Sequence, residues 1–315
     1  MARPDRHHLI SVDDLTGREL RWLVHRGAQY AAGECDGARP LADAVVGVLF
    51  RKTSTRTRTA FSAGALRLGG RVITYGPDDL QENTGESAED TGEVLSRMLD
   101  VLVARTTGST EELRAYAAQR RMAVVNAMSA AEHPTQALTD LTTMLGRFGR
   151  IEGLRVLYAG EGNNTASALA LALSRFPGTE LHLRTPAGYG LDPDYLDRAR
   201  RHAKESGALV EERHDMAGLP EADVVYTTRW ETTGTAKADP GWRRVFAPFR
   251  VDAAVLAACP GAVFMHDLPA HRGDEVTGEV LDGPASIAFD QAENKYHSAR
   301  AVLEWCLGGI PAELA

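Results

Sequence analysis

The chain has 315 residues, of which 43% are apolar and 25% charged, so it is long enough for a well-buried core and for two domains. The formal net charge of −8 argues against a general nucleic-acid binder, because nucleic acids attract basic surfaces. Three widely spaced cysteines without a CxxC pair argue against a disulfide framework and a zinc site, and favour a reducing cytoplasm. No apolar stretch is long enough to cross a bilayer, so we expect no membrane partner.

Short β-rich runs alternate with amphipathic stretches in the first half of the chain. The predicted strands cover residues 44–50, 71–75, 100–106 and 122–127, and a long helical stretch follows at about 133–149. Strands that alternate with helices are typical of a parallel sheet in an α/β domain.

The same alternation starts again after that helix. The second series of predicted strands covers residues 154–160, 180–186, 208–214, 222–228 and 262–266, and a last amphipathic helix covers about 291–307. We therefore predict an α/β fold with two domains, residues 1–148 and 149–290, each with an open, mainly parallel sheet flanked by helices. The C-terminal helix, within residues 291–315, is predicted to pack back on the first domain. Open parallel sheets bind ligands at the carboxyl ends of their strands.

The stretch FRKTSTRTRTAF (50–61) directly follows the first predicted strand. A helix is predicted over residues 60–68, which makes Ser54 the expected N-cap. Backbone N–H groups, hydroxyls and guanidinium groups at a helix N-terminus form a site for a small anion such as phosphate. Arg56 and Arg58 lie about 200° apart around a helix axis, so we assign Arg56 to the anion and Arg58 to a structural ion pair. The alternative is an ordinary capped helix with solvated arginines.

Several segments in order resemble one enzyme family over nearly the whole chain. They are STRTR (54–58), VARTTG (103–108), HPTQAL (133–138), GEGNN (160–164), HDLPAHRG (266–273) and FDQAENKYH (289–297). Together they resemble the aspartate/ornithine carbamoyltransferases, and the last two segments are similar to the ornithine branch. A lone GEGNN would be only a weak dinucleotide-binding signal, because it lacks the third glycine of that fingerprint.

The resemblance implies transfer of a carbamoyl group from carbamoyl phosphate to an amine, with no metal or organic cofactor. Residues Ser54, Thr55, Arg56 and Thr57 are expected to hold the phosphate. Arg105, His133 and Thr57 would face the carbonyl oxygen as it gains charge, which is typically worth roughly 3 kcal/mol per donor. The resemblance gives the carbamoyl NH2 to Gln136 and the Leu268 backbone. Lys295 stands where the ornithine branch has an arginine, so it keeps the charge and loses the bidentate fork.

The acceptor side departs from the ornithine branch at several positions. Thr228 replaces the aspartate that grips the α-ammonium group, and Thr232, Thr233 and Gly234 replace Ser-Met-Gly. Arg229 is similar to an arginine of the aspartate branch that binds a substrate carboxylate. Asn164 matches an asparagine that contacts the amino acid's carboxylate in the ornithine branch.

A further departure is Asp267, which replaces the cysteine beside the attacking amine. A carboxylate at this position would attract a cationic amine and could accept its proton. The alternative is a loop carboxylate that pairs with Arg272 or Arg229.

These departures predict a small amino-acid-like acceptor other than ornithine, in specialised metabolism. One alternative is ornithine carbamoyltransferase of arginine metabolism with a divergent site. The other is a catalytically silent regulatory paralogue, which has no need of the intact Arg56, Arg105, His133 and Gln136. The resemblance also implies homotrimers, or multiples of trimers, with active sites at subunit borders.

Overall fold

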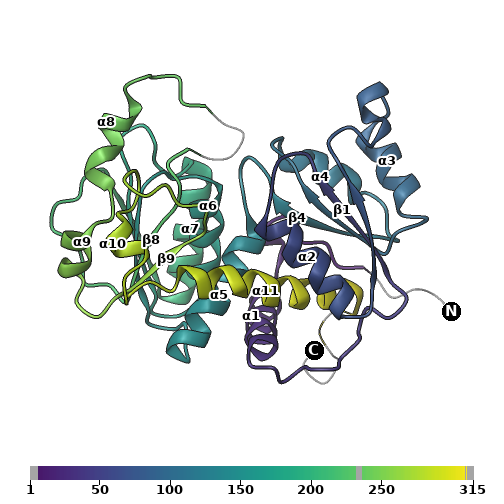
Figure 1. The fold of residues 1–315 in the computed structure, drawn as a ribbon, viewed down its shortest axis with the longest axis horizontal. Helices are drawn as coiled ribbons and strands as arrows, with labels where there is room; N and C mark the ends of the chain where they lie inside the picture. The colour runs from purple at the N-terminus through teal and green to yellow at the C-terminus, as the bar shows by residue number, and fades with distance from the viewer. Residues whose placement is uncertain (1–5, 232–235, 309, 311–315) are drawn as a thin grey trace. The chain divides into compact units, whose positions relative to one another are not determined.

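A computed structural model describes residues 6–231, 236–308 and 310. The chain divides into two compact units (Figure 1). Unit 1 comprises residues 1–146 and 294–315, and unit 2 comprises residues 147–293. In the described part of the chain, no helix combines the length and the apolar character needed to span a membrane.

Unit 1 is built on a four-stranded parallel sheet with the strand order β2-β1-β3-β4. Its strands are β1 (Val45–Phe50), β2 (Arg71–Tyr75), β3 (Val101–Arg105) and β4 (Ala123–Met128). β3 and β4 are buried along their whole length, as expected for parallel strands that are covered on both faces. The helices of unit 1 that precede β4 in the chain are η1 (Val12–Asp14), α1 (Gly17–Ala31), α2 (Arg56–Arg67), η2 (Gln81–Thr84), α3 (Ala88–Leu95) and α4 (Thr110–Tyr116).

Two long helices contribute residues to both units. These are α5 (Pro134–Phe148) and α11 (Ala288–Gly308). Within unit 1, α11 lies beside α1 and α2 (Figure 1). The Glu304 carboxylate of α11 accepts hydrogen bonds from Arg26 Nε and Nη2, both at 2.8 Å, and from the Tyr30 hydroxyl at 2.7 Å. Charge-assisted hydrogen bonds of this kind attach the end of α11 to α1.

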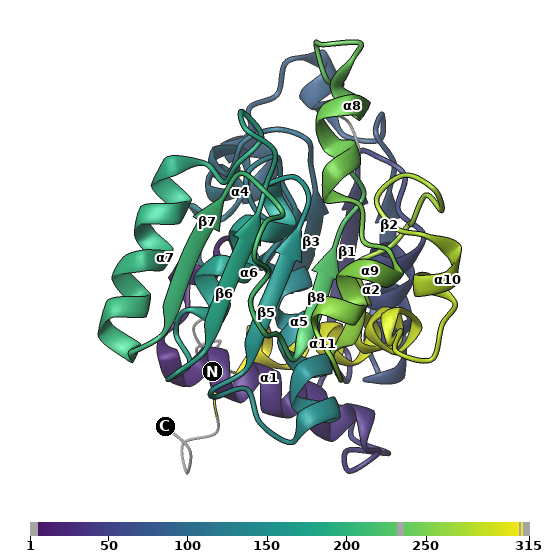
Figure 2. The same ribbon diagram turned by 90° about the vertical axis from the view of Figure 1, so that its left-hand side faces the viewer.

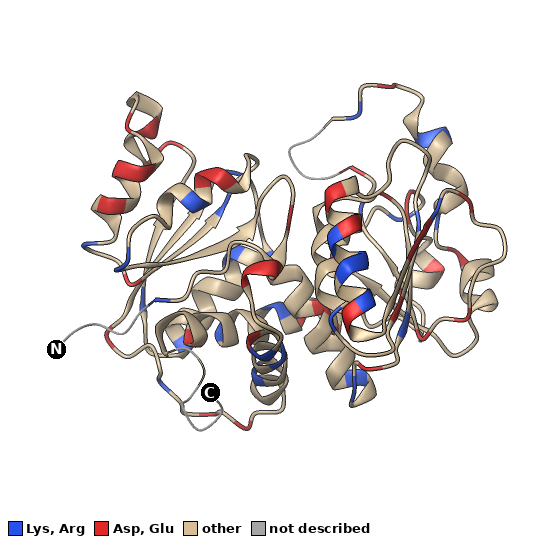
Figure 3. Ribbon diagram, turned by 180° about the vertical axis from the view of Figure 1, so that it is seen from behind, with Lys and Arg blue, Asp and Glu red and all other residues tan. Residues whose placement is uncertain are grey.

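Unit 2 is built on a five-stranded parallel sheet with the order β7-β6-β5-β8-β9, most of which is visible in Figure 2. Its strands are β5 (Arg155–Ala159), β6 (Glu180–Arg184), β7 (Leu209–Arg213), β8 (Val224–Thr227) and β9 (Val263–His266). Its helices are α6 (Asn164–Leu173), α7 (Pro193–Ser206), α8 (Trp242–Phe246), η3 (Ala247–Phe249), α9 (Ala253–Ala258) and α10 (Gly278–Leu281). α6 is buried all round, whereas α7 carries charges of both signs (Figure 3).

The fold prediction is confirmed. Both sheets are open and parallel, each predicted strand is present, and the C-terminal helix packs within unit 1. The predicted start of the helix that follows β1 is wrong, however, because we expected a helix over residues 60–68 with Ser54 as its N-cap. α2 begins at Arg56 with Thr55 as its N-cap, and the side chain of Thr55 makes no capping hydrogen bond. The apolar pattern starts only at Ala60, but backbone hydrogen bonding starts earlier, with Thr59 N donating to Thr55 O at 3.3 Å.

Candidate active site

The predicted phosphate loop occupies the N-terminus of α2. Ser54, Thr55, Arg56 and Thr57 precede or open the helix, and the Thr57 side chain is buried. Ser54 Oγ accepts a hydrogen bond from Arg105 Nη1 at 3.5 Å. Ser54 follows β1 and Arg105 ends β3, so this bond lies at the carboxyl ends of two neighbouring strands. The side chain of the N-cap residue Thr55 makes no capping hydrogen bond to the first turn of α2. The N–H groups of that turn and the positive end of the helix dipole therefore favour an anion.

Arg58 is not the ion-paired residue that we expected. It donates to the Phe50 carbonyl at 3.3 Å, and its guanidinium lies 5.3 Å from the centroid of the Phe50 ring. No described carboxylate lies within ion-pair distance of it. A cation–π contact and a backbone hydrogen bond hold Arg58 against Phe50 at the end of β1.

Arg105 lies at the carboxyl end of β3, where the pairing with β4 shifts register. Ala104 is paired with Asn126 and Arg105 with Met128, so one residue of β4 is skipped. Met128 takes up the irregularity with a φ of 150°. Such a bulge re-aims the side chains next to it and is common beside active sites.

His133 precedes the first residue of α5 and is almost fully buried. Its Nδ1 lies 3.2 Å from the hydroxyl of Thr135. Burial lowers the pKa of His133 well below its usual range, and the positive charges of Lys295 and Arg105 lower the pKa further. His133 is therefore neutral at pH 7, and one ring N–H remains for donation to an oxygen that gains negative charge.

Gln136 is held by residues from two helices. Its Nε2 donates to Asp140 Oδ1 at 2.7 Å within α5, and its Oε1 accepts from Lys295 Nζ on α11. All three side chains are buried. Asp140 was missed by the sequence analysis, because an aspartate one turn along a helix resembles any other polar helix residue.

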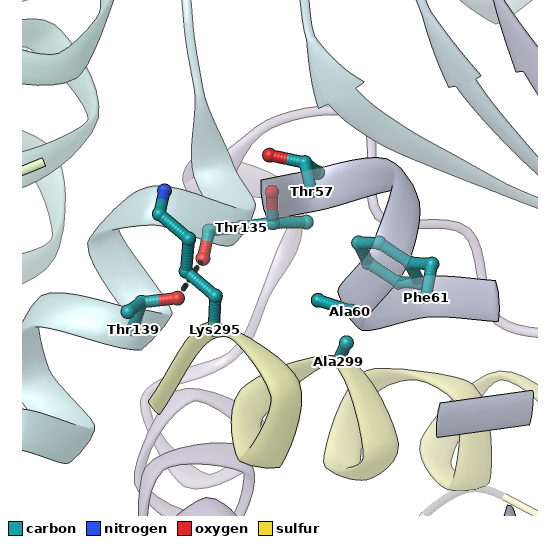
Figure 4. A pocket seen from close by; sticks show the side chains of 7 residues that line it. All are labelled: Thr57, Ala60, Phe61, Thr135, Thr139, Lys295 and Ala299. Carbon is teal, nitrogen blue, oxygen red and sulfur yellow. Dashed lines mark hydrogen bonds between the residues drawn. The ribbon is translucent and has the colours of Figure 1, made fainter. Parts of the chain in front are cut away.

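A small pocket lies beside this group. It is lined by Thr57 and Phe61 of α2, Thr135 and Thr139 of α5, and Lys295 of α11, together with Ala60 and Ala299 (Figure 4). The Thr139 hydroxyl donates a hydrogen bond to the Thr135 carbonyl at 2.8 Å. The pocket joins the helix that carries the predicted phosphate loop to the ammonium group of Lys295, so α2, α5 and α11 all contribute to one polar region of unit 1.

Glu132 immediately precedes His133 and was also missed. It is fully buried, and its Oε2 accepts from Ser11 Oγ at 2.7 Å while its Oε1 accepts from Val12 N at 2.6 Å. Asn126 completes the network by donating to the Ile10 carbonyl at 2.8 Å. The segment before α1 is thereby attached to the loop that carries the predicted catalytic histidine.

In unit 2 the predicted acceptor residues Asn164 and Thr228 follow β5 and β8, which are neighbours in the sheet. Asn164 is the buried first residue of α6, and the N-cap is the adjacent Asn163, whose Oδ1 accepts from the N–H groups of Thr165 and Ala166. Thr228 is also buried. Its Oγ1 accepts from Asn163 Nδ2 at 3.0 Å and lies 3.1 Å from the Tyr158 hydroxyl. The hydroxyl at the expected aspartate position thus connects the two strand ends.

Asp267 follows β9 and has a buried partner in α6. Its Oδ2 accepts a hydrogen bond from Thr165 Oγ1 at 3.0 Å. The alternative pairing with Arg272 is wrong, because Arg272 makes a bidentate pair with Asp282 at 3.0 and 2.6 Å. The other carboxylate oxygen of Asp267, Oδ1, lies 3.6 Å from Nδ1 of the preceding His266 ring.

The backbone at Leu268 is fixed by a buried histidine and glutamate. Leu268 N donates to His266 Nδ1 at 2.8 Å, so the ring proton resides on Nε2, which is 3.1 Å from Glu275 Oε1. Glu275 also accepts from His271 N at 2.6 Å. Arg229 is partly buried beside Thr228, and Thr232 and Thr233 lie outside the described residues.

The fold and these residues are those of a two-unit α/β enzyme with a cationic, hydroxyl-rich site in its first unit. Comparison with known proteins identifies its family. The chain belongs to the aspartate/ornithine carbamoyltransferases: residues 7–146 match the family's carbamoyl-P binding domain, and residues 152–306 match its Asp/Orn binding domain. It is an enzyme that transfers a carbamoyl group, which removes the silent-paralogue alternative.

Relatives resemble the chain over nearly its full length. It is 41% identical to "Ornithine carbamoyltransferase" of Thermococcus kodakarensis, with 96% of each chain covered. It is 39% identical to the enzyme of that name from Nitrosococcus oceani, with 96% of this chain and 98% of the relative covered. The solved structure of ornithine carbamoyltransferase from Pyrococcus furiosus has a TM-score of 0.91 and 35% identity, covering 99% of this chain and 100% of that one.

These relatives overturn one expectation. The prediction of an acceptor other than ornithine is contradicted by relatives of 37–41% identity that are named ornithine carbamoyltransferase. The structure shows how one of the replacements behind that prediction can mislead. Thr228, one of the positions that argued against ornithine, is buried and forms hydrogen bonds with Tyr158 and Asn163, so its identity reflects local packing as well as any ligand.

Proposed function

We propose that this carbamoyltransferase transfers the carbamoyl group of carbamoyl phosphate to ornithine, with release of phosphate, as a step of arginine metabolism. The observation that supports this most strongly is the similarity to enzymes named ornithine carbamoyltransferase across both family domains. In this proposal unit 1 binds carbamoyl phosphate and unit 2 binds the amino acid.

Unit 1 supplies the electrostatic part of the chemistry. The N-terminus of α2, with Ser54, Thr55, Arg56 and Thr57, holds the phosphate group, and Lys295 adds positive charge. Arg105 and neutral His133 donate to the carbonyl oxygen, where negative charge develops when the carbonyl carbon becomes tetrahedral. Gln136, already oriented by Asp140 and Lys295, positions the carbamoyl NH2. The family resemblance adds the backbone of Leu268, a residue of unit 2.

Unit 2 supplies the acceptor residues. We assign Asn164, Thr228 and Arg229 to the binding of ornithine, Arg229 through the carboxylate. Thr232 and Thr233 belong to the same proposal on sequence grounds. Asp267 attracts the cationic side of ornithine and accepts a proton from its attacking amine, since only the neutral amine is a nucleophile.

The bond changes are those of an acyl-type transfer. The amine nitrogen forms a bond with the carbonyl carbon, the bond between that carbon and the phosphate oxygen breaks, and phosphate leaves with the electron pair. The attacking nitrogen starts as an ammonium group, loses two protons and keeps one: Asp267 accepts the first, and the departing phosphate accepts the second. Positioning and charge stabilisation by the residues above account for the catalysis, and the proposal assigns no step to a metal or organic cofactor.

The proposal is tested by incubating the enzyme with carbamoyl phosphate and either ornithine, aspartate, putrescine, lysine or 2,4-diaminobutyrate. Phosphate release, corrected for spontaneous breakdown, and the mass of the product are recorded. We expect ornithine to give the highest kcat/KM and a product one carbamoyl group heavier. A clear preference for another amine would refute ornithine as the acceptor.

The assignment of Arg56 has its own control on the same helix. Arg56→Ala should weaken carbamoyl phosphate binding at least about tenfold, because charge-assisted hydrogen bonds to an anion are lost. Arg67→Ala, at an exposed position in the last turn of α2, should leave that binding unchanged. Equal binding by the Arg56→Ala variant and the unmodified enzyme would remove Arg56 from the phosphate site.

We further propose that the enzyme is a homotrimer and acts in the cytoplasm. The family resemblance supports the trimer. The three cysteines, Cys35, Cys259 and Cys306, are buried free thiols, which is compatible with a reducing compartment.

A further inference from the structure

A lysine in unit 2, Lys237, has an almost completely buried side chain. Only 4% of that side chain is exposed to solvent. The residue lies between β8 and α8 and is not part of any motif that identified the family. A buried ammonium group loses its hydration, so it is stable only where other groups compensate its charge.

Three aromatic rings and one carboxylate supply that compensation. Lys237 Nζ lies 4.9 Å from the centroid of Tyr189, 5.3 Å from that of Trp242 and 4.7 Å from that of Phe246. It also forms an ion pair with Glu161. Rings at this distance attract a cation through their electron-rich faces, most strongly when water is excluded. We call Tyr189, Trp242, Phe246 and Glu161 the ammonium cage.

The rings of the cage form one packed cluster with Trp230. The Tyr189 and Phe246 centroids are 4.8 Å apart and meet edge to face, as do those of Trp242 and Phe246 at 5.3 Å. The Trp230 ring lies 5.5 Å from Phe246 and 6.4 Å from Trp242. Trp230 is buried, and its indole nitrogen has no hydrogen-bond partner among the residues that the structure describes, whereas its ring packs against the cage rings.

The cage therefore joins two loops that carry the proposed acceptor residues. Glu161 lies in the loop after β5, two residues before Asn163, whose amide binds Thr228. Trp230 follows Thr228 and Arg229 directly after β8. Removal of the cation would take the Lys237 ion pair from Glu161 and would loosen the cluster that fixes Trp230, so both loops would lose the same anchor.

We propose that Lys237 is a positioning residue that acts as an internal ammonium ligand, and that the cage is a binding site for a primary alkylammonium group. The role in positioning rests on the proposed transfer to an amino-acid acceptor. The binding of alkylammonium by the cage does not, because it follows from the rings and Glu161 alone.

The first test replaces the lysine and offers a substitute cation. Lys237→Ala removes three methylenes and the ammonium group, a space that propylammonium matches. We expect the KM for ornithine to rise about tenfold, while kcat and the affinity for carbamoyl phosphate change less than twofold. Propylammonium should restore the KM in a saturable way, whereas 1-propanol, which has no charge, should not. Product masses separate this rescue from use of propylammonium as an acceptor.

A second variant and a matched control guard against a general folding defect. Lys237→Met, whose side chain is one atom shorter than that of lysine, fills most of the cage without a charge, so its KM should also rise but should not respond to propylammonium. Lys204→Ala changes an exposed lysine of α7 in the same unit and should behave as the unmodified enzyme. Normal ornithine KM in both Lys237 variants would overturn the positioning role.

The second test reads the cage without any turnover. Trp242 and Trp230 lie in or against the cage, so their fluorescence should change in Lys237→Ala and return towards the original spectrum as propylammonium is added. The unmodified enzyme, with its cage filled, should give no saturable response. A flat titration of Lys237→Ala would refute the ammonium site even if the enzyme uses ornithine. Conversely, a saturable titration would support the site even if the proposed acceptor were wrong.

Discussion

The carboxylate of Glu132 illustrates how one buried residue can hold the loop that carries the predicted catalytic histidine. Its two oxygens accept from Ser11 and Val12, which lie 121 and 120 positions away in the sequence. A buried carboxylate with two short hydrogen bonds is stable only as long as both donors remain in place. The position of His133 thus depends on a segment near the N-terminus of the chain.

Replacing Glu132 should destabilise the protein in a graded way. Glu132→Leu leaves the Ser11 hydroxyl and the Val12 N–H without an acceptor, at a cost of about 1–3 kcal/mol for each buried group. Glu132→Gln keeps one acceptor oxygen and should cost less. Urea unfolding measures both, with the exposed Glu34→Gln as control. Equal unfolding free energies for Glu132→Leu and the control would show that the network contributes nothing.

His133 should make the stability depend on pH below about 6.5. In the unfolded chain a histidine takes up a proton near pH 6.5, whereas burial and two nearby cations lower the pKa of His133 in the folded protein. The unfolded state therefore binds more protons as the pH falls, so the free energy of unfolding decreases.

The check is to measure unfolding by urea at pH 7.5 and pH 5.5 for the unmodified enzyme and for His133→Gln. We expect the enzyme to lose more stability between these values than the variant, which lacks the titrating group. A loss of the same size in both proteins would mean that His133 titrates normally and is not held neutral by its surroundings.

At the scale of the elements, the loop after β5 is packed too closely for a larger residue at Gly162. A methyl group there would overlap the backbone of Gly190 and Leu191, and Gly162 N donates to the Tyr189 carbonyl at 2.8 Å. Neither neighbour can move without moving Tyr189, a member of the ammonium cage. The glycine is thus required by the close approach of two backbones.

Gly162→Ala should lower stability by about 1–3 kcal/mol, the usual cost of overpacking, and should raise the KM for ornithine. Gly146→Ala in α5 is a suitable control, because its added methyl group meets no atom within 4 Å and alanine favours the helix. Thermal unfolding and steady-state kinetics of the two variants decide the matter. An unchanged melting temperature for Gly162→Ala would show that the loop can shift to accommodate the added methyl group.

The elements were predictable from the sequence because their signals are local. Runs such as AVVGVLF and DVLVART identify buried strands, and their alternation with helices defines the parallel sheets. The start of α2 was missed because Arg56 to Thr59 carry no apolar pattern. Conversely, the contiguous motif HPTQAL located the start of α5, and STRTR marked the segment at the N-terminus of α2 without giving its first helical residue.

The residues that orient the site were not predictable in this way. Thr165 binds Asp267 from 102 positions away, and Lys237 binds Glu161 from 76. Such pairs depend on which strands are neighbours in the folded sheet, and no local pattern encodes this. One of the several replacements behind the wrong acceptor prediction has a related explanation: the threonine at position 228 was interpreted as a change of ligand, although its side chain also has two protein partners.

For the whole molecule, the proposed trimer gives a simple expectation. Light scattering on a gel-filtered sample should give a mass three times that of the 34.0 kDa chain, or a multiple of it. Because the resemblance implies active sites at subunit borders, specific activity should fall when dilution dissociates the oligomer. A mass equal to that of one chain, with full activity, would refute the trimer.

The packing of α11 in unit 1 has a consequence for how the protein is made. Residues from Asn294 onward belong to unit 1, and Lys295, Ser298 and Glu304 contact α5 or α1. During translation these residues leave the ribosome only after all of unit 2 has been synthesised. Unit 1 therefore remains incomplete, without the contacts of α11, although its sheet is the first to be made. Its nascent chain would need protection from aggregation for longer than that of unit 2.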